Sequence, residues 1–195
     1  HPLMTRIAMV AGEASSDQLA AHLIGALRKH LPDAKFYGIG GPKMQREGFE
    51  SLWPAEMLAV HGYAEALRNY RVIARMRRQL LRHLLADRPD VFIGVDGYDF
   101  NLSLERRLKR AGITTIHYVS PSIWAWRRHR LRNIIGSVSH ILALYPFEPE
   151  LYKDTEVKCS YVGHPMAEVI PLDIDQNQAR EKLGVAVGRP VVALL

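Results

Sequence analysis

The sequence contains a single cysteine, Cys159, among its 195 residues, so no disulfide can form within the chain. A lone thiol fits a protein of a reducing cytosol, and Cys159 reads as a small apolar packing residue near a strand. Long hydrophobic runs are also missing, because the apolar stretches have only a few residues whereas a membrane-spanning helix needs about 20. With 48% apolar and 24% charged residues, the composition predicts a globular chain that is neither disordered nor fibrous.

The sequence motifs of several enzyme classes are absent as well. The nine histidines show neither an HExxH pattern nor the spacing of two histidines with one carboxylate, so we expect no metal site. No GxSxG segment and no cysteine–histidine pairing indicates a covalent nucleophile. The loop at residues 11–17, which follows the first predicted strand, has one glycine, and this excludes a GxGxxG signature and a P-loop.

The formal net charge is +6, which suits a polyanion, an anionic membrane surface or a phosphorylated substrate. Part of this charge lies on a long helix predicted over residues 64–86, where arginines recur every three or four residues. We expect them either on the solvated face of a helix packed on the core or on a surface that meets lipid headgroups. Aromatic residues do not interleave with them, so nucleic acid is not an expected partner. The arginine stripe comprises Arg68, Arg71, Arg75, Arg78 and Arg82.

Short apolar runs alternate with helical patterns along most of the chain, which predicts an α/β fold with a doubly wound, Rossmann-like parallel sheet. A polar helix is predicted over residues 173–183, and the apolar run VVALL follows it at the end of the sequence. We therefore expect an N-terminal domain over residues 4–170. Residues 171–195 would hold a linker helix and the first strand of a second α/β domain that is otherwise absent.

Ligands of open parallel sheets bind at the carboxyl ends of the strands, so carboxylates there are candidates for chemistry. Asp96 ends the apolar strand predicted from residue 91, and a partly desolvated carboxylate can be tuned as a general base. Its alternative role is a helix N-cap, the role that we favour for Asp99 and that Asn101 fits equally well.

The loop after the first predicted strand carries Glu13, Ser15 and Asp17. It either contacts a ligand or simply connects strand and helix, and both readings stay open. The two carboxylates disfavour a bare phosphate and favour hydroxyl groups, such as those of a sugar. Ser15, Ser16 and Asp17 are also candidate N-caps of the helix that follows.

Another polar loop begins at Ser120 and carries Trp124, Trp126 and Arg127. Aromatic rings stack on sugar faces or acyl chains, and arginine suits phosphate, although the tryptophans can instead fold back onto the core. Further along the chain, His164 follows a short strand. It is a candidate phosphate contact, but a lone histidine at a strand end is more often structural.

Several of these segments occur in the order found in the lipid-A-disaccharide synthase family, which the chain resembles from Met4 to Leu195. YVSPSIWAWR is the most specific of them, and Ser16 stands where that family usually has glycine. The segments are GEASSD (12–17), GVDGYDFN (94–101), HYVSPSIWAWR (117–127), YPFE (145–148) and VGHP (162–165).

The resemblance implies that the chain is the N-terminal portion of a two-domain glycosyltransferase B fold. It implies an inverting hexosyltransferase that joins UDP-2,3-diacylglucosamine to 2,3-diacylglucosamine 1-phosphate (lipid X), giving lipid A disaccharide 1-phosphate and UDP, without metal or other cofactor. Asp96 matches the proposed catalytic residue and would remove the proton of the acceptor 6-hydroxyl. The implied substrate contacts are Glu13, Ser15, Asp17, Asp99, Asn101, Ser120, Trp124, Trp126, Arg127 and His164. This chain alone is expected to be inactive, because half of the cleft would be missing.

The family resemblance also implies a cytoplasmic protein that is peripheral on the inner membrane, which favours the lipid-facing reading of the arginine stripe. Acyl chains would then suit Met57, Leu58, Val60 and Tyr63. The expected partners are the two lipid substrates, the anionic membrane surface and the missing C-terminal domain. The alternative is a basic α/β module that docks on membranes without catalysis.

Overall fold

The computed structural model describes residues 4–58, 63–122 and 130–194, and their side chains except those of residues 57, 63–69 and 130. The chain forms two compact units, His1–Gly163 and His164–Leu195. The candidate carboxylates of the strand ends all belong to the first unit.

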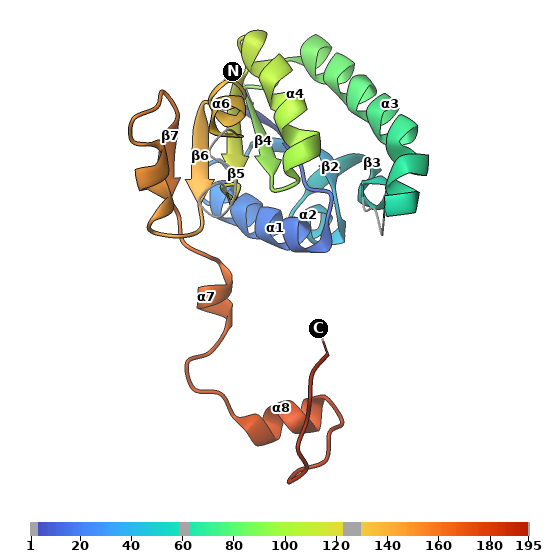
Figure 1. Ribbon diagram of the computed structural model, residues 1–195, viewed down its shortest axis with the longest axis vertical. Helices are drawn as coiled ribbons and strands as arrows, with labels where there is room; N and C mark the ends of the chain where they lie inside the picture. Colours follow the sequence, from blue (N-terminus) through green and yellow to red (C-terminus); the bar gives the residue numbers. More distant parts are fainter. Residues whose placement is uncertain (1–3, 59–62, 123–129, 195) are drawn as a thin grey trace. The chain divides into compact units, whose positions relative to one another are not determined.

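The first unit is built on a seven-stranded parallel sheet with the order β3-β2-β1-β4-β5-β6-β7 (Figure 1). The order reverses direction between β1 and β4, as in doubly wound nucleotide-binding folds. The predicted fold class, an α/β fold with a Rossmann-like parallel sheet, is confirmed. The strands are β1 (Arg6–Val10), β2 (Lys35–Gly40), β3 (Phe49–Pro54), β4 (Val91–Val95), β5 (Thr114–Tyr118), β6 (His140–Ala143) and β7 (Lys158–Tyr161).

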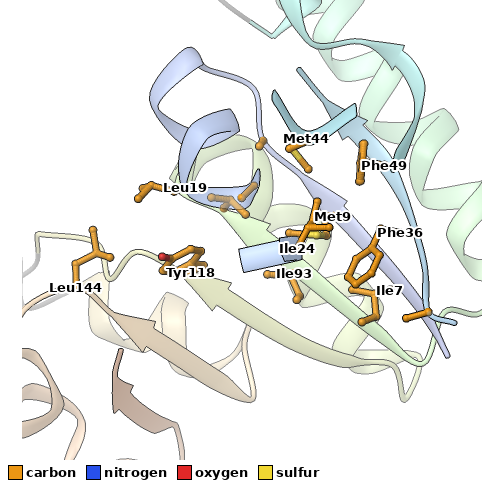
Figure 2. Packing of buried hydrophobic residues seen from close by; sticks show 14 residues of the cluster. Ile7, Met9, Leu19, Ile24, Phe36, Met44, Phe49, Ile93, Tyr118 and Leu144 are labelled. Atoms are coloured by element: carbon orange, nitrogen blue, oxygen red, sulfur yellow. The ribbon is translucent and has the colours of Figure 1, made fainter. Parts of the chain in front are cut away.

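Helices cover both faces of the sheet, which explains why the strands are apolar on both sides. Successive side chains of a strand point to opposite faces, so Ile7 and Met9 of β1 pack with α1, and Ala8 and Val10 pack with α3 and α4 (Figure 2 shows the first cluster). Each large apolar side chain buried here contributes about 1.5–3 kcal/mol. The helices are α1 (Ala14–Arg28), α2 (Pro42–Arg46), α3 (Tyr63–Asp87), α4 (Tyr98–Arg110) and α6 (Arg130–Ile135), with 3-10 turns η1 (Ala55–Met57) and η2 (Glu148–Tyr152).

Helix α1 begins at Ala14, and the residue before it, Glu13, makes no side-chain capping bond. The prediction that Ser15, Ser16 or Asp17 caps this helix is therefore wrong. Asp17 is buried and turns to the neighbouring helix instead, where its oxygens accept hydrogen bonds of 3.0 Å from the amides of Lys43 and Met44. These are the free amides at the start of α2, so Asp17 caps a helix that is distant in sequence.

The second unit contains two short helices, α7 (Met166–Val169) and α8 (Gln176–Lys182). Asp175 caps α8 by accepting hydrogen bonds from the amides of Asn177 and Gln178. Residues 191–194 are not in a strand, and a strand there needs partner strands from elsewhere. The assignment of residues 171–195 to a further domain therefore stays a prediction. Among the helices that the structure describes, none combines the length and apolarity needed to cross a bilayer.

Candidate functional site

The loops after β1 and β4 lie at the point where the strand order reverses, which is where open α/β sheets bind ligands. Glu13 follows β1 and Asp96 follows β4, and the two strands are paired so that Val10 lies beside Gly94. Glu13 is exposed and Asp96 is half-buried. The sheet thus brings two predicted site carboxylates to neighbouring strand ends.

The backbone at this edge adopts left-handed conformations that residues other than glycine rarely adopt. Asp96 and Gly97 both have φ of 51°, and Val119, which follows β5, has φ of 79°. For a non-glycine residue this conformation costs roughly 1–3 kcal/mol, and such residues concentrate at functional sites. The amide of Asp96 donates to the Tyr118 carbonyl (2.9 Å) and that of Val119 to the Leu142 carbonyl (3.0 Å), so hydrogen bonds to the next strand hold both turns.

The side chain of Asn101 holds the turn at Asp96 from below. Asn101 is buried, and its amide donates to the carbonyl oxygen of Asp96 (2.9 Å) and, over 3.4 Å and 3.5 Å, to those of Val95 and Val10. Helix α4 starts at Tyr98 after Gly97, so the prediction that Asp99 or Asn101 is its N-cap is wrong. Because the left-handed Gly97 turns the chain into the helix early, Asn101 lies inside the helix and links the ends of β1 and β4.

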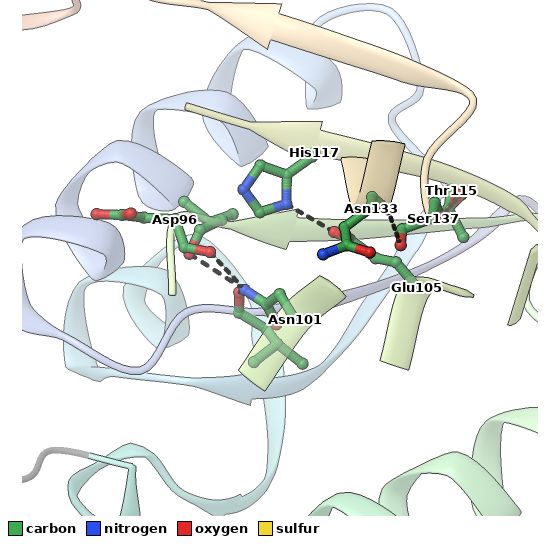
Figure 3. A network of polar contacts seen from close by, with 9 residues as sticks. Asp96, Asn101, Glu105, Thr115, His117, Asn133 and Ser137 are labelled. Carbon is green, nitrogen blue, oxygen red and sulfur yellow. Dashed lines mark hydrogen bonds and ion pairs between the residues drawn. The ribbon is translucent and has the colours of Figure 1, made fainter. Parts of the chain in front are cut away.

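A buried ion pair lies next to this turn (Figure 3). His117 of β5 and Glu105 of α4 are 1% and 0% exposed, and Nδ1 of His117 lies 2.8 Å from Oε1 of Glu105. A Cβ at Gly94 would lie 2.1 Å from that oxygen, so the glycine makes room for the carboxylate. Burial lowers the pKa of His117, but the charge and hydrogen bond of Glu105, followed by the charge of Asp96, outweigh it, and the pKa is raised.

The sequence prediction missed this pair. Two signals were present: Glu105 follows Asn101 by four residues on one helix, and His117 interrupts an apolar strand. Helical spacing indicates that Asn101 and Glu105 share a face, but only the fold brings that face beneath β5.

A cavity of about 640 Å³ opens at the carboxyl ends of β1, β2 and β3. Glu13 and Ser15 line it and are exposed, as is Glu56. Asp17 also lines it, although both of its oxygens already bind α2. Carboxylates and a hydroxyl at such a mouth suit the hydroxyl groups of a sugar. The lining residues are Gly12, Glu13, Ala14, Ser15, Asp17, Gly41, Pro42, Lys43, Ala55 and Glu56.

Ser120 and Asp99 lie apart from this cavity. Ser120 is buried, and its hydroxyl lies 2.8 Å from the Tyr152 hydroxyl, so it anchors the start of the loop that follows β5. Asp99 is exposed and lines a groove along α4 together with Arg106 and Arg110. Trp124, Trp126 and Arg127, which were predicted to contact substrate, lie outside the described residues.

His164 belongs to the second unit, where its Nδ1 accepts a hydrogen bond of 3.2 Å from the amide of Met166. Its contact with a ligand stays a prediction. Among the described residues, no group of three or more histidine, cysteine, aspartate or glutamate side chains is arranged to hold a metal ion.

The arginine stripe of α3 lies on the surface as far as its side chains are described. Arg71, Arg75, Arg78 and Arg82 are exposed, and the last three line one shallow groove with Gln79. The opposite face of α3 packs on the sheet through apolar side chains. Tyr70 and Val72, close in sequence to the stripe, are 65% and 46% exposed.

Among the other residues predicted for a lipid surface, Leu58 has a described side chain. Leu58 is partly buried and packs over Gly12. A Cβ added at Gly12 would lie 2.8 Å from the Cβ of Leu58. Val60 lies outside the described residues, and so do the side chains of Met57, Tyr63 and Arg68. Their role in lipid contact stays a prediction.

Residues 7–195 match the family model described as lipid-A-disaccharide synthetase. The chain is 60% identical over 193 residues to the lipid-A-disaccharide synthase of Aromatoleum aromaticum, and 55% identical over 189 residues to that of Neisseria meningitidis serogroup C. These matches cover 99% and 97% of this chain but 49% of each relative. The chain therefore spans about half the length of the curated relatives that it matches.

One solved structure supports the fold independently. The chain is similar to Arabidopsis thaliana UGT89C1 complexed with UDP, with a TM-score of 0.52 and 16% sequence identity, over 95% of this chain and 55% of that one. At this identity the likeness concerns the fold alone.

Proposed function

The chain belongs to the lipid-A-disaccharide synthetase family, and from this premise we propose that it is the acceptor-side half of an inverting glycosyltransferase of lipid A biosynthesis. The proposed reaction joins UDP-2,3-diacylglucosamine to lipid X and yields lipid A disaccharide 1-phosphate and UDP. The observation that carries the proposal is the position of Asp96, a half-buried carboxylate on a left-handed turn where the strand order reverses.

In the proposed mechanism Asp96 accepts the proton of the acceptor 6-hydroxyl while that oxygen attacks the anomeric carbon of the donor. The new carbon–oxygen bond forms as the bond to UDP breaks, and UDP leaves with the electron pair. A single displacement of this kind inverts the anomeric centre. General base catalysis of such a step typically contributes about 10²–10⁴-fold in rate. The hydrogen bond from Asn101 to the Asp96 carbonyl would fix the direction of the carboxylate.

Sugar hydroxyl groups would bind at the cavity beside β1, where Glu13 and Ser15 are exposed and free of the capping role that occupies Asp17. The tryptophan–arginine loop, Asp99 and His164 remain proposed contacts of the lipid substrates. Asn101 and Ser120 are buried, so they would act on substrate through the turns that they anchor.

The chain would be completed by a second domain that binds the nucleotide, with residues 4–170 as the first domain and 171–195 as the connection. Two observations support this: the relatives are about twice as long, and apolar side chains of the second unit, such as Leu172 (102%) and Val192 (92%), are exposed. We further propose a peripheral position on the cytoplasmic side of the inner membrane, with the arginine stripe on anionic headgroups.

The decisive experiment replaces Asp96 in the full-length protein by Asn, which tolerates left-handed backbone and so preserves the turn. Asp96→Asn should lower kcat/KM for lipid X by at least about 10²-fold while leaving the thermal unfolding midpoint unchanged. Asp154→Asn, at an exposed turn residue, is the matched control and should retain activity. Near-normal turnover by the Asp96 variant would refute the proposed base.

The alternative is a non-catalytic module that docks on membranes, which the exposed arginine stripe would also suit. In that case the full-length protein would bind vesicles but transfer no sugar from UDP-2,3-diacylglucosamine. Sugar transfer that depends on Asp96 would exclude this alternative.

A further inference from the structure

The His117–Glu105 ion pair is fully enclosed between β4, β5 and α4. Both side chains are at most 1% exposed, so neither can touch a substrate. Their site is prepared for them, because Gly94 on the adjacent strand leaves the space that Oε1 of Glu105 occupies. The fold therefore accommodates this ion pair specifically, and the presence of the pair requires a physical explanation.

A contribution to stability does not by itself explain why the fold buries this ion pair. Removing two charges from water costs several kcal/mol per ion, and an apolar pair of similar volume is often as stable or more stable. In addition, Oε2 of Glu105 is buried and has no hydrogen-bond partner among the described residues. A buried and incompletely satisfied carboxylate of this kind points to a role in function.

The residue beside the pair is Asp96. His117 lies next to Gly94 in the β4–β5 register, and the Asp96 amide bonds the following residue, Tyr118. Figure 3 shows the imidazole ring between Asp96 and Glu105, with Nδ1 turned to Glu105. The charged groups acting on the ring are Glu105 from α4 and Asp96 from the end of β4. On the other side, β6 places the apolar Ile141 beside it in register.

We propose that the His117–Glu105 pair is a positioning device that directs a buried positive charge at the Asp96 carboxylate and so favours its role as the proton acceptor. This inference rests on the proposed role of Asp96 as the base. Glu105 holds His117 in the charged form, and the imidazolium presents its positive charge toward Asp96. The pair has no net charge, so it acts on Asp96 as a dipole whose positive end is nearer.

Such a dipole matters when substrates fill the cleft. Lipid substrates exclude water, and desolvation favours the protonated form of a carboxylic acid, which cannot act as a base. A buried positive charge opposes this effect without entering the cleft or competing for substrate. His117 is thus a positioning residue, and it does not itself take the acceptor proton.

The test is Glu105→Gln in the full-length protein, with kcat/KM measured across pH. Glutamine keeps the shape and one acceptor oxygen but removes the charge, so buried His117 loses its reason to stay protonated. The acidic limb of the profile should move up by about one pH unit, giving about tenfold lower kcat/KM on the acidic side and a wild-type plateau at high pH. Glu150→Gln, at an exposed residue of η2, carries the same charge change and should leave the limb in place.

A purely structural role predicts something different, namely a loss of the same factor at every pH, and that result would overturn the inference. If Glu105→Gln does not fold, the double variant with His117→Gln places two neutral amides in the same space and should show the same shift of the limb. An unmoved limb in either folded variant, or failure of both variants to fold, would also overturn it.

The result of this test can be distinguished from a failure of the proposed function. An inactive Asp96→Asn with an unmoved limb in Glu105→Gln would reject only the dipole. An active Asp96→Asn would reject the base itself, and the dipole with it.

Discussion

Asn101 donates a 2.9 Å hydrogen bond from within helix α4 to the carbonyl oxygen of Asp96, and the same amide also reaches the carbonyls of Val95 and Val10. One buried side chain thus joins the ends of β1 and β4 at the point where the sheet reverses its order. The left-handed turn at Asp96 is unfavourable by itself, so it needs a partner of this kind to persist.

Asn101→Ala should therefore affect stability and catalysis together. The carbonyls that it serves would lose a buried donor, which costs about 1–3 kcal/mol in the free energy of unfolding, measured by urea denaturation. With the turn released, kcat should fall more than KM changes, because the base is misdirected while the sugar cavity is intact. Asn133→Ala is the control, since Asn133 is exposed and its side-chain oxygen accepts a hydrogen bond from Arg106, away from the Asp96 turn. Unchanged stability and kcat would show that the turn holds without Asn101.

Gly94→Ala tests how tightly Glu105 and Asn101 pack against β4. A Cβ at this position would lie 2.1 Å from Oε1 of Glu105 and 3.0 Å from Cβ of Asn101. Overpacking of a buried site typically costs about 1–3 kcal/mol, so the thermal unfolding midpoint should fall. Gly136→Ala provides the comparison, because the nearest atom to its Cβ is a backbone oxygen at 3.6 Å, an ordinary contact. Equal midpoints for the two variants would contradict the tight packing of Glu105 under β4.

The sequence was sufficient for the fold because the apolar runs of the strands and the helices between them are local patterns. It also placed Asp96 correctly at a strand end, since the apolar strand that precedes it stops there. The roles of Asn101 and Asp17 were not predictable, because each binds backbone groups that are distant in sequence: Asn101 reaches β1, and Asp17 caps α2.

The pair of Glu105 and His117 escaped prediction for the same reason. Each residue alone reads as an ordinary polar residue of a helix or strand, and the fully buried contact exists only once α4 packs against β5.

The free energy of unfolding should depend on pH through Asp87, at the end of α3. The Arg6 guanidinium forms a hydrogen bond and ion pair with this carboxylate and holds its pKa below the usual range, although partial burial opposes the shift. The folded pKa is depressed, so the stabilisation is present above the unfolded pKa of about 3.9 and is lost as pH falls through the lower folded value. Asp87→Asn should be less stable than wild type near neutrality, and the difference should shrink below about pH 4.

Urea denaturation at a series of pH values between neutrality and the acid range measures this difference. Asp33→Asn, at an exposed turn, removes a carboxylate that forms no ion pair within the described part of the chain, and it should follow wild type throughout. A constant difference between Asp87→Asn and wild type at every pH would mean that ionisation of Asp87 is not the cause.

The arginine stripe leads to a prediction about membrane binding. Arg71 and Arg75 are exposed on α3, close in sequence to the exposed apolar Tyr70 and Val72. A basic residue near an anionic bilayer contributes about 1 kcal/mol, so Arg71→Glu with Arg75→Glu should weaken partition of the full-length protein onto phosphatidylglycerol-containing vesicles by at least about 30-fold. Co-sedimentation at low and high salt measures this, and salt should reduce binding of the wild type because it screens the charges.

The matched control reverses the same number of charges at the opposite edge of the sheet, with Lys153→Glu and Lys158→Glu. Both residues are exposed, Lys153 directly after η2 and Lys158 at the start of β7. Because the net charge of the two double variants is the same, any difference in vesicle binding reports where the charge lies. A stripe that meets the membrane predicts strong loss only for the α3 variant. Equal loss in both would assign binding to net charge alone, and equal retention would leave the stripe as a solvated helix face.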